Sequence, residues 1–422
     1  MSKIEELIEK LCPNGVEFKK LEEITKSINI GINPRKFFKL NPADSTGFYA
    51  TVRELNGLKG VKEYEKTDKI NDEAIQIINN RANIENGDIL FSNTGTVGKL
   101  ALVNETPTNW GVNEGIYIIK PIEEKILSKY LYYYLDSSHA YKDYSSKFTG
   151  STLKHVTQKA LASLIVAVPP LDVQCEIVHI LDDFTLLSAE LSAELKARQK
   201  QYEYYMDKIF NNATQTKMVK LSDVLVSLKT GLNPRKFFQL NTPDANGYYV
   251  TVRELGDRNV RYWESKDRIN QIGLSRINER SNLEINDVLF SGTGTIGRVS
   301  IIEEKPENWN VKEGVYILKP KIDLINPVFL MYLMKSNYMR NIYSNYIVGS
   351  PVSSVPMKDL KNVEFDLPSI EEQEKIVRIL DRFDQLCTDI SEGLPAEIEA
   401  RQKQYEYYRD KLLTFKELKV NE

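Results

Sequence analysis

The chain has 422 residues and a mass of 48.5 kDa, enough for two or three domains, and hydrophobic residues make up 41% of it. Its formal net charge of −3 excludes a protein that is basic throughout, although local basic loops on an acidic chain still allow a nucleic-acid partner. The three cysteines and three histidines are widely separated, which excludes a disulfide framework and a zinc site of ordinary spacing.

The first residues predict a charged amphipathic helix from Met1 to Lys10, with Ser2 and Glu5 placed as a capping box. This start differs from a signal peptide, and no apolar run reaches the ~18 residues that a bilayer-spanning helix needs. We therefore expect a cytoplasmic protein with no membrane partner. The start of the chain precedes the first globular domain in the same way as the first long helix precedes the second one, so the chain is nearly circular. We therefore expect this helix to lie near Leu412 and Leu413, at the end of the second long helix.

The next segments are predicted to be mostly strands, which makes the fold class α+β. Apolar runs at 88–92, 100–103, 116–119 and 164–168 are typical of strands, and 128–135 is typical of a helix. The turn Thr94 to Gly98 joins the first two of these strands. This turn lacks the spacing of a nucleotide-binding phosphate loop and leads into a strand instead of a helix, so nucleotide binding is not expected.

A loop from Asn33 to Phe38 sets Arg35 and Lys36 beside two phenylalanines. Cations and aromatic rings together suit phosphate contacts and base stacking, and a solvated turn with the rings in the core is the alternative. The loop superficially resembles the Asn-Pro-Pro-Tyr loop of amino-methyltransferases. However, Arg35 replaces the second proline, and no glycine-rich cofactor loop precedes it.

Apolar residues three and four positions apart predict a long helix from about Leu171 to Phe210. At 1.5 Å per residue, some 40 residues extend for roughly 60 Å. A second such pattern runs from about Ile370 to Leu413, opens with Ser369 and Glu372 as a capping box, and is expected to kink at Pro395. Each helix leaves one apolar stripe uncovered, so we expect the two to be partners in an antiparallel coiled coil.

The chain contains an internal duplication. Gly31 to Phe38 returns as Gly231 to Phe238, and Thr51 to Leu55 returns letter for letter as Thr251 to Leu255. The turn that ends in Lys99 returns with Arg298 in its last position, so a cation is kept. We expect Arg53 and Arg253 to lie in strands, where each either reads a base or forms an ion pair with a neighbouring carboxylate such as Glu54.

The nine residues Ala197 to Tyr205 also return unchanged, as Ala400 to Tyr408. Their tyrosines can pack within the coiled coil or form an outer surface for a protein partner. The period of the duplication is too long for a solenoid. We therefore predict two mixed α/β domains in a pseudo-twofold arrangement, separated by the two long helices. The domain boundaries follow as 1–167 and 213–366 for the globular domains, with helical regions at 168–212 and 367–422.

The arrangement resembles the DNA-specificity subunit of type I restriction-modification systems. The resemblance is carried by the glycine turns, the repeated tyrosine-rich ends and several further segments: Gly150-Ser151-Thr152 with Lys154, Val168 to Gln174, Ile177 to Leu181, Gly349-Ser350, Leu367 to Gln373 and Ile376 to Leu380. His155 and Pro351 depart from the family pattern, which often has polar residues there.

The resemblance implies a subunit with no active site, no cofactor and no metal of its own. Its target-recognition domains would each read half of a bipartite site in double-stranded DNA. Its helical regions would dock two methyltransferase subunits, which bind S-adenosylmethionine, and nuclease/translocase subunits complete the enzyme. Two alternatives stay open, a specificity chain of a type II-like modification enzyme and a paired-domain protein scaffold that binds no DNA.

On this interpretation the tetrad Ser192 to Leu195 is expected to act as a ruler for the gap between the half-sites. The candidate DNA-binding residues are Arg35, Lys36, Arg53, Thr94, Thr96, Lys99, Lys154, Arg235, Lys236, Arg253, Thr293, Thr295 and Arg298. The candidate partner-binding residues are Tyr202, Tyr204, Tyr205, Tyr405, Tyr407 and Tyr408.

Overall fold

The computed structural model describes residues 3–34, 37–150, 154–212, 216–234, 237–388 and 394–418. It divides into two compact units: unit 1 is formed by 1–190 and 399–422, and unit 2 by 191–398. The unit boundaries therefore fall inside the two helical regions. Each unit contains a globular part together with portions of both helical regions.

The described residues of unit 1 form three sheets, of four, three and two strands. Its elements are α1 (Lys3–Leu11), β1 (Glu17–Lys20), β2 (Thr25–Ile30), β3 (Gly47–Ala50), β4 (Lys69–Ile70), α2 (Asp72–Ala82), β5 (Ile89–Ser92), β6 (Leu100–Leu102), β7 (Trp110–Val112), β8 (Ile116–Pro121), α3 (Ser128–Asp136), α4 (Ser138–Ser146), α5 (Gln158–Ala162) and β9 (Ile165–Val168). The strands and the helix predicted between residues 88 and 168 are confirmed.

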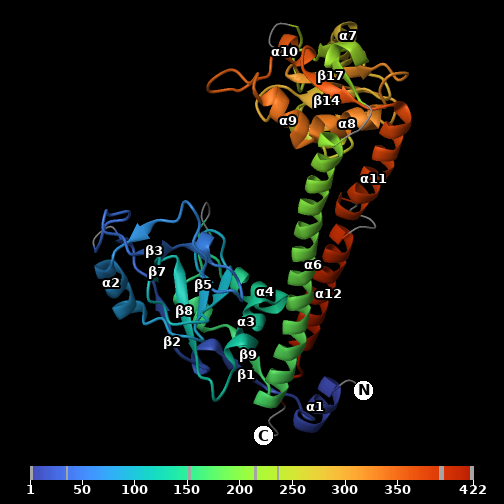
Figure 1. Cartoon of the computed structure of the whole chain (residues 1–422). Coiled ribbons are helices and arrows are strands. Elements are labelled where there is room, and N and C mark those ends of the chain that lie inside the picture. Colours follow the sequence, from blue (N-terminus) through green and yellow to red (C-terminus); the bar gives the residue numbers. More distant parts are fainter. Residues whose placement is uncertain are drawn as a thin grey trace. The chain divides into compact units, whose positions relative to one another are not determined.

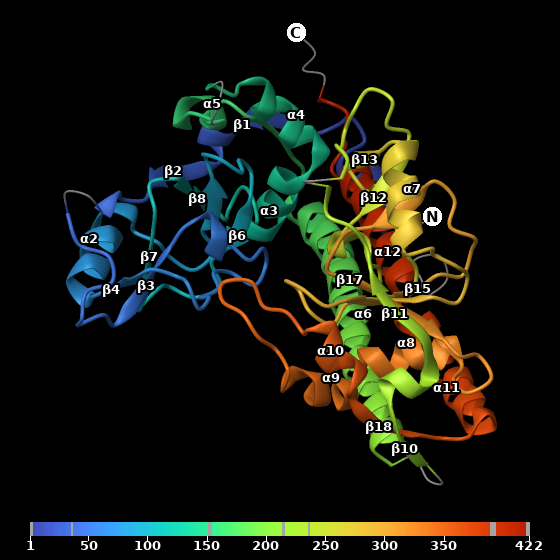
Figure 2. The same cartoon turned by 90° about the horizontal axis from the view of Figure 1, so that it is seen from above.

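The four-stranded sheet β2-β8-β5-β6 is antiparallel and separates two hydrophobic cores. Side chains alternate across a strand, so Phe91 and Tyr117 face one core while Leu90 and Ile118 face the other. Figures 1 and 2 show α3 and α4 on one side of this sheet, and β3, β7 and α2 on the other. Burial on both faces explains why β5 and β8 have continuous apolar sequences.

Unit 2 repeats this plan. Its elements are β10 (Lys217–Lys220), β11 (Leu225–Thr230), β12 (Gly247–Val250), β13 (Arg268–Ile269), α7 (Gln271–Arg280), β14 (Val288–Ser291), β15 (Val299–Ile301), β16 (Trp309–Val311), β17 (Val315–Pro320), α8 (Pro327–Lys335), α9 (Asn337–Ser344), α10 (Met357–Lys361) and β18 (Glu364–Leu367). The four-stranded sheet has the order β11-β17-β14-β15, and Phe290 and Leu289 face its two different cores.

The first helical region is one continuous helix, α6 (Leu171–Asn211), as the sequence predicts. The second is described as two helices, α11 (Ile370–Thr388) and α12 (Leu394–Leu412), and residues 389–393 lie outside the described residues. Pro395 lies in the first turn of α12, where its missing N–H costs no helical hydrogen bond. The Ser369 cap of α11 is confirmed by a 3.4 Å bond from the Glu372 N–H to the Ser369 hydroxyl, whereas Ser2 lies outside the described residues.

The helical regions pair within each unit, as the apolar stripes predict. In unit 1 the Phe184 ring of α6 stacks on Tyr408 of α12, with centroids 5.6 Å apart. In unit 2 the same contact joins Tyr205 of α6 to Phe383 of α11, at 5.9 Å. The end of α6 and the start of α11 both contact the beginning of α8, through Phe210 and Gln373, so these two helices are antiparallel.

The terminal segments of the chain meet in unit 1, as predicted. Ile4 of α1 and Leu413 belong to one hydrophobic core, and Leu412 is packed against it. The Val16 N–H donates to the Lys416 carbonyl at 2.9 Å, and the Leu418 N–H donates to the Val16 carbonyl at 2.9 Å. The segment after α12 is therefore part of the fold of unit 1.

Candidate nucleic-acid interface

Five segments of unit 1 meet at one end of the four-stranded sheet, and we call this surface the turn face. They are residues 31–34, 51–55, 93–99, 113–115 and the two arms 147–150 and 154–156 of a hairpin; the equivalent segments of unit 2 form a second turn face. Backbone hydrogen bonds join residues 93–99, which we call the glycine turn, to two of the other segments. The Asn93 N–H donates to the Gly115 carbonyl at 2.8 Å, and the Gly95 N–H donates to the Lys154 carbonyl at 3.0 Å. Segments that carry most of the predicted DNA-binding residues are thus brought together.

The glycine turn is held in shape by Ser92. Its hydroxyl donates to the Thr96 carbonyl at 2.5 Å and accepts from the Lys99 N–H at 2.7 Å. Gly95 and Gly98 have φ angles of 74° and 92°, a region in which other residues are strained. The exposed Thr96 at the tip is therefore displayed on a fixed backbone.

The prediction that Arg53 and Arg253 lie in strands is wrong. Both belong to 3₁₀ turns, η3 (Val52–Glu54) and η6 (Val252–Glu254). The preceding threonine caps each turn, because its hydroxyl accepts from the arginine N–H at 3.4 Å in unit 1 and 3.3 Å in unit 2. This side-chain-to-backbone bond competes with strand pairing.

The predicted ion pair of Arg53 with Glu54 is confirmed, with Nε and Oε1 2.7 Å apart. Burial of Glu54 raises its pKa, but hydrogen bonds from Thr51, Arg53 and Thr67 outweigh this effect and hold the pKa below its ordinary value. Arg53 also donates from Nη2 to the Lys66 carbonyl at 2.8 Å. Two nitrogens of Arg53 therefore form hydrogen bonds within the protein. These bonds fix the direction in which the half-exposed guanidinium points.

Lys99 joins the glycine turn to η3, the 3₁₀ turn that carries Arg53, and we call η3 and η6 the arginine turns of the two units. Its Nζ donates to the Val52 carbonyl at 2.8 Å and to the Arg53 carbonyl at 3.1 Å. In unit 2 the exposed Arg298 makes the same two contacts from Nη1, to Val252 at 3.3 Å and Arg253 at 3.4 Å. An arginine has five N–H groups, so it can hold these carbonyls and still donate to a phosphate.

Lys154 lies on a two-stranded hairpin, residues 147–156, which we call hairpin 1; its residues 151–153 lie outside the described part. Thr149 and His155 exchange two backbone bonds, of 2.8 and 2.9 Å. The His155 ring contacts the Thr94 hydroxyl, with Nδ1 and Oγ1 3.0 Å apart. Exposed Lys154 lies 5.8 Å from the Phe148 ring centroid. In unit 2 the Gly294 N–H donates to the Ser353 carbonyl, and Thr293 and Ser354 form an antiparallel β-bridge.

Four predicted residues, Arg35, Lys36, Arg235 and Lys236, lie outside the described residues. Of the two phenylalanines that follow Arg35 and Lys36, one packs against the core and the other is exposed, where it could stack on a base. Phe38 meets Tyr49 edge-on in the core, with centroids 5.7 Å apart, whereas Phe37 is 53% exposed.

The candidate residues chosen from the sequence did not include Glu114 and Asn33, which also belong to the turn face. The Asn33 amide donates to the exposed Glu114 carboxylate at 2.5 Å. Both residues return in the duplication, as Asn233 and Glu313, and this repetition is the signal that could have identified them. A carboxylate on this face can accept a hydrogen bond from a base amino group.

The predicted partner-binding tyrosines fall into three pairs. Tyr202 and Tyr405 are packed against the cores of units 2 and 1, respectively. Tyr205 and Tyr408 stack on the phenylalanines of the paired helices. Tyr204 and Tyr407 are each 61% exposed, so this pair alone among the six turns mainly outward.

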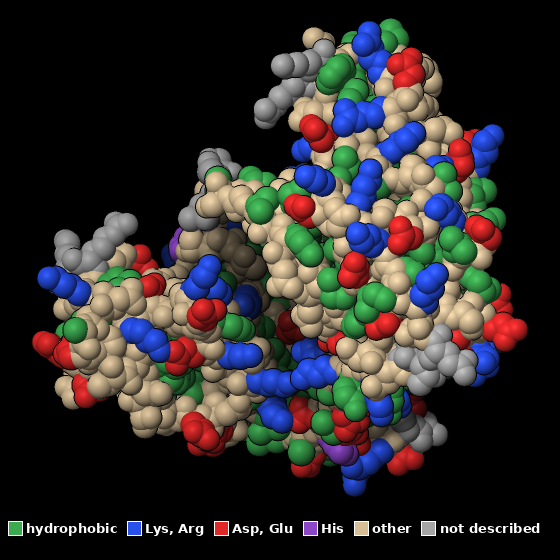
Figure 3. Space-filling model, turned by 45° about the horizontal axis from the view of Figure 1, so that its top comes forward, with side chains coloured by type: hydrophobic (Ala, Val, Ile, Leu, Met, Phe, Trp, Pro, Cys, Tyr) green, Lys and Arg blue, Asp and Glu red, His purple; other side chains and the backbone are tan. Residues whose placement is uncertain are grey.

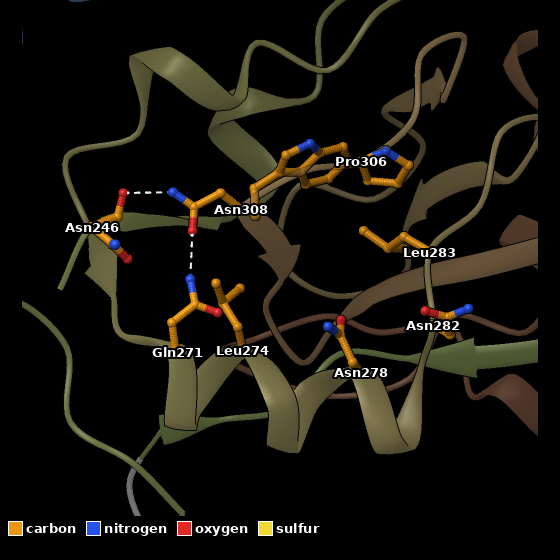
Figure 4. A pocket seen from close by; sticks show the side chains of 9 residues that line it. Asn246, Gln271, Leu274, Asn278, Asn282, Leu283, Pro306 and Asn308 are labelled. Carbon is orange, nitrogen blue, oxygen red and sulfur yellow. Dashed lines mark hydrogen bonds between the residues drawn. The ribbon is translucent and has the colours of Figure 1, made fainter.

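Unit 2 also contains a cavity of about 250 Å³ that no sequence pattern predicts. Figure 4 shows its amide-rich lining, including Asn246, Gln271 and Asn278, and the Gln271 amide donates to Asn308 at 3.1 Å. The cavity lies where β12 and β16 begin, because Asn246 precedes one strand and Asn308 the other. Both strands end toward Thr251 and Glu313, so the cavity is at the opposite end of this sheet from the turn face.

On the face shown in Figure 3, lysine and arginine side chains and aspartate and glutamate side chains are both present over most of the surface. Within the described residues, no three His, Cys, Asp or Glu side chains are grouped to hold a metal ion. No helix in the described part of the chain is long and apolar enough to cross a bilayer.

The glycine turn gives a direct test of its geometry. Gly297→Ala is expected to destabilise unit 2 by about 2–3 kcal/mol, because φ is +93° and a Cβ would lie 2.5 Å from the buried Tyr343 hydroxyl. Gly294→Ala in the same turn has φ +79° but open space around the Cβ, so it should cost only about 1 kcal/mol. Urea unfolding of the two full-length variants measures the difference, and equal losses would contradict the steric argument.

Comparison with known proteins agrees with this architecture. The family model for the type I restriction modification DNA specificity domain matches residues 13–198 and again residues 214–400. A putative type I restriction enzyme specificity subunit from Haemophilus influenzae, S.HindORF215P, is 28% identical over 97% of this chain and 98% of its own length. The specificity subunit of the type I restriction enzymes EcoR124I and EcoR124II from Escherichia coli is 31% identical over 69% of this chain and 72% of its own.

The fold is also shared with a solved protein. One chain from a structural study of complex assembly and conformational transition in a type I restriction-modification system has a TM-score of 0.64 and 17% identity, and the match covers 95% of this chain and 98% of that one. The two matched segments of the family model together take in most of the sequence. The chain therefore belongs to the family of type I restriction-modification specificity subunits.

Proposed function

We propose that this chain reads a bipartite DNA target through its two turn faces and docks the methyltransferase and nuclease subunits of a type I complex. Members of this family are specificity subunits without catalytic activity of their own. On the proposal, S-adenosylmethionine and the methylation of adenine belong to the partner methyltransferases. The chain supplies recognition and assembly.

The observation that carries the proposal is the convergence of the repeated residues. In unit 1 the arginine turn, the glycine turn and hairpin 1 are joined by Lys99 and by the Gly95 N–H. In unit 2 the equivalent hydrogen bonds are made by Arg298, to the Val252 carbonyl, and by the Gly294 N–H, to the Ser353 carbonyl. Fixed loops that display threonines, amides and cations on one surface suit both phosphate and base-edge contacts.

Mapping the methylated motif tests the proposal. The full chain is produced with its methyltransferase subunits, and methylated adenines are located by sequencing. We expect two short half-sites with a non-specific gap between them. We also expect the half-sites to be related, because Thr51 to Leu55 and Thr251 to Leu255 are identical. A single uninterrupted motif would contradict the two-face proposal.

Salt dependence separates this function from a scaffold that binds no DNA. Affinity of the full chain for a target duplex should fall steeply with salt, with a log–log slope of about −0.9 for each phosphate neutralised. A scaffold that binds no DNA would show no measurable affinity for the duplex even at low salt, where phosphate contacts are strongest.

The exposure of the Tyr204 and Tyr407 side chains supports a docking role for this tyrosine pair. Replacing Tyr204 and Tyr407 by alanine is expected to weaken methyltransferase docking at least about tenfold, because large exposed aromatics dominate protein interfaces. Thermal stability should stay nearly unchanged. The matched control, Tyr202→Ala, removes a ring packed against the core of unit 2 and should lower stability instead. Pull-down titration with the methyltransferase measures docking, and unchanged docking in the double variant would refute the assignment.

A further inference from the structure

The two units differ in the chemistry of the hairpin that completes each turn face. Hairpin 1 carries Lys147, Lys154 and His155. The equivalent segment of unit 2, residues 346–355, has no charged residue at all, and we call it hairpin 2. The backbones match nonetheless, because Val348 and Ser354 exchange two bonds of 2.8 Å, just as Thr149 and His155 bond in unit 1.

Hairpin 2 exposes apolar side chains. Val352 is 59% exposed and Val348 52% exposed, and Tyr346 and Ile347 beside them are also exposed. Figures 1 and 2 both show this hairpin, drawn in orange between α9 and α10, projecting from the body of unit 2. Several exposed apolar side chains together mark a surface that a partner covers.

We propose that hairpin 2 contacts thymine methyl groups in the major groove of its half-site, whereas hairpin 1 contacts DNA phosphates through Lys154. The inference rests on the proposed function and names the chemistry by which each unit reads DNA. Thymine is the base that presents a methyl group in that groove, and apolar side chains recognise it. A two-stranded β-ribbon also fits the groove.

Continuity with the turn face favours DNA over a protein as the occupant. Hairpin 2 bonds directly to the glycine turn through the Gly294 N–H and Ser353 at 2.8 Å, and through the Val355 N–H and Gly292 at 2.9 Å. The glycine turn displays Thr295 and Arg298, which are exposed. A duplex that contacts Arg298 therefore meets hairpin 2 on the same surface, whereas a protein on the hairpin would cover the DNA-reading residues.

The test uses the full-length protein and a duplex that carries the mapped target. Deoxyuridine in place of thymine keeps base pairing and removes only the methyl group. For the wild-type chain we expect uracil in the half-site of unit 2 to weaken binding about fourfold for each methyl contact, from about 0.8 kcal/mol per buried methyl group. Val352→Ser should lose about fourfold of this discrimination, the contribution of one methyl contact. The matched control, Val226→Ser, changes a 63% exposed valine on β11 and should behave like the wild type.

The salt arm tests the other half of the proposal. Lys154→Ala should make the log–log salt slope shallower by about 0.9, and Val352→Ser should leave it unchanged. Loss of methyltransferase docking in Val352→Ser, with thymine discrimination retained, would show that hairpin 2 binds protein. Wild-type indifference to uracil would also overturn the proposal. Failure of the proposed function itself is distinguishable, because the wild-type chain would then bind target and scrambled duplexes equally.

Discussion

Arg409→Met is expected to lower the free energy of unfolding of unit 1 by about 2–3 kcal/mol, below the ~3–5 kcal/mol of a fully buried pair. Arg409 is 9% exposed, and its Nη1 lies 2.6 Å from the Asp136 carboxylate, which keeps partial solvent access. Methionine stands at the equivalent position of unit 2, where Met206 lies in an apolar core. In unit 1 the same side chain would leave Asp136 without its cation.

The pH dependence of this variant has a defined sign. Burial raises the pKa of Asp136 above its ordinary value, and Arg409 opposes that rise, so removing the arginine raises the pKa further. A carboxylate with a raised pKa binds its proton more tightly in the folded chain. The contribution of Asp136 to stability is therefore greatest in acid, and it falls as pH rises through the folded-state pKa of this group. The deficit of Arg409→Met should be largest near neutral pH and smaller in acid.

Two further variants complete the measurement by urea unfolding. Arg198→Met removes an exposed arginine paired with Glu194 and should change stability by no more than ~0.5 kcal/mol. Adding Asp136→Asn to Arg409→Met should recover part of the loss, because no buried charge then lacks a partner. A deficit that is the same at every pH, and that is not relieved by Asp136→Asn, would show that methionine simply fits this site badly.

The contrast between Arg409 and Met206 also shows what sequence reasoning could reach. Apolar periodicity predicted α6, which buries one stripe, and short continuous apolar runs predicted the strands β5, β6 and β8, whose residues are all buried. It could not predict η3, since the Thr51 hydroxyl and the Glu54 carboxylate form a local capped turn within a strand-like sequence. Local side-chain bonds of this kind leave no periodic signal.

The candidate site was predictable as a set of residues but not as a surface. The duplication singled out Arg53, Thr96 and Lys99, yet only the fold shows that Lys99 holds the carbonyls of the arginine turn. The six repeated tyrosines lie in two identical sequence segments, so the sequence does not distinguish between them. Their exposure differs because a neighbouring helix covers some of the rings and not others. Contacts between residues far apart in the sequence therefore determine which groups the cations bind and which pair of tyrosines is exposed.

Deleting Ser192 to Leu195 is expected to shorten the non-specific gap in the DNA target by one or two base pairs and to leave both half-sites unchanged. These residues lie in the continuous helix α6, just past Glu190, where unit 1 ends. Four residues turn a helix by about 400°, so the deletion rotates the apolar stripe by only about 40° and shortens α6 by about 6 Å. Duplex DNA rises about 3.4 Å per base pair, which converts this length to one or two base pairs.

The matched control keeps the length of α6 and changes its sequence. Replacing Ser192 to Leu195 by four alanines preserves helix propensity and rise, so the gap should stay as in the wild type. Both variants are produced with the methyltransferase subunits, and the methylated motif is mapped for each. If the gap is shortened in the deletion variant and unchanged in the four-alanine variant, the length of α6 sets the gap. An unchanged gap in an active deletion variant, or altered half-site bases, would show that α6 does not set the distance.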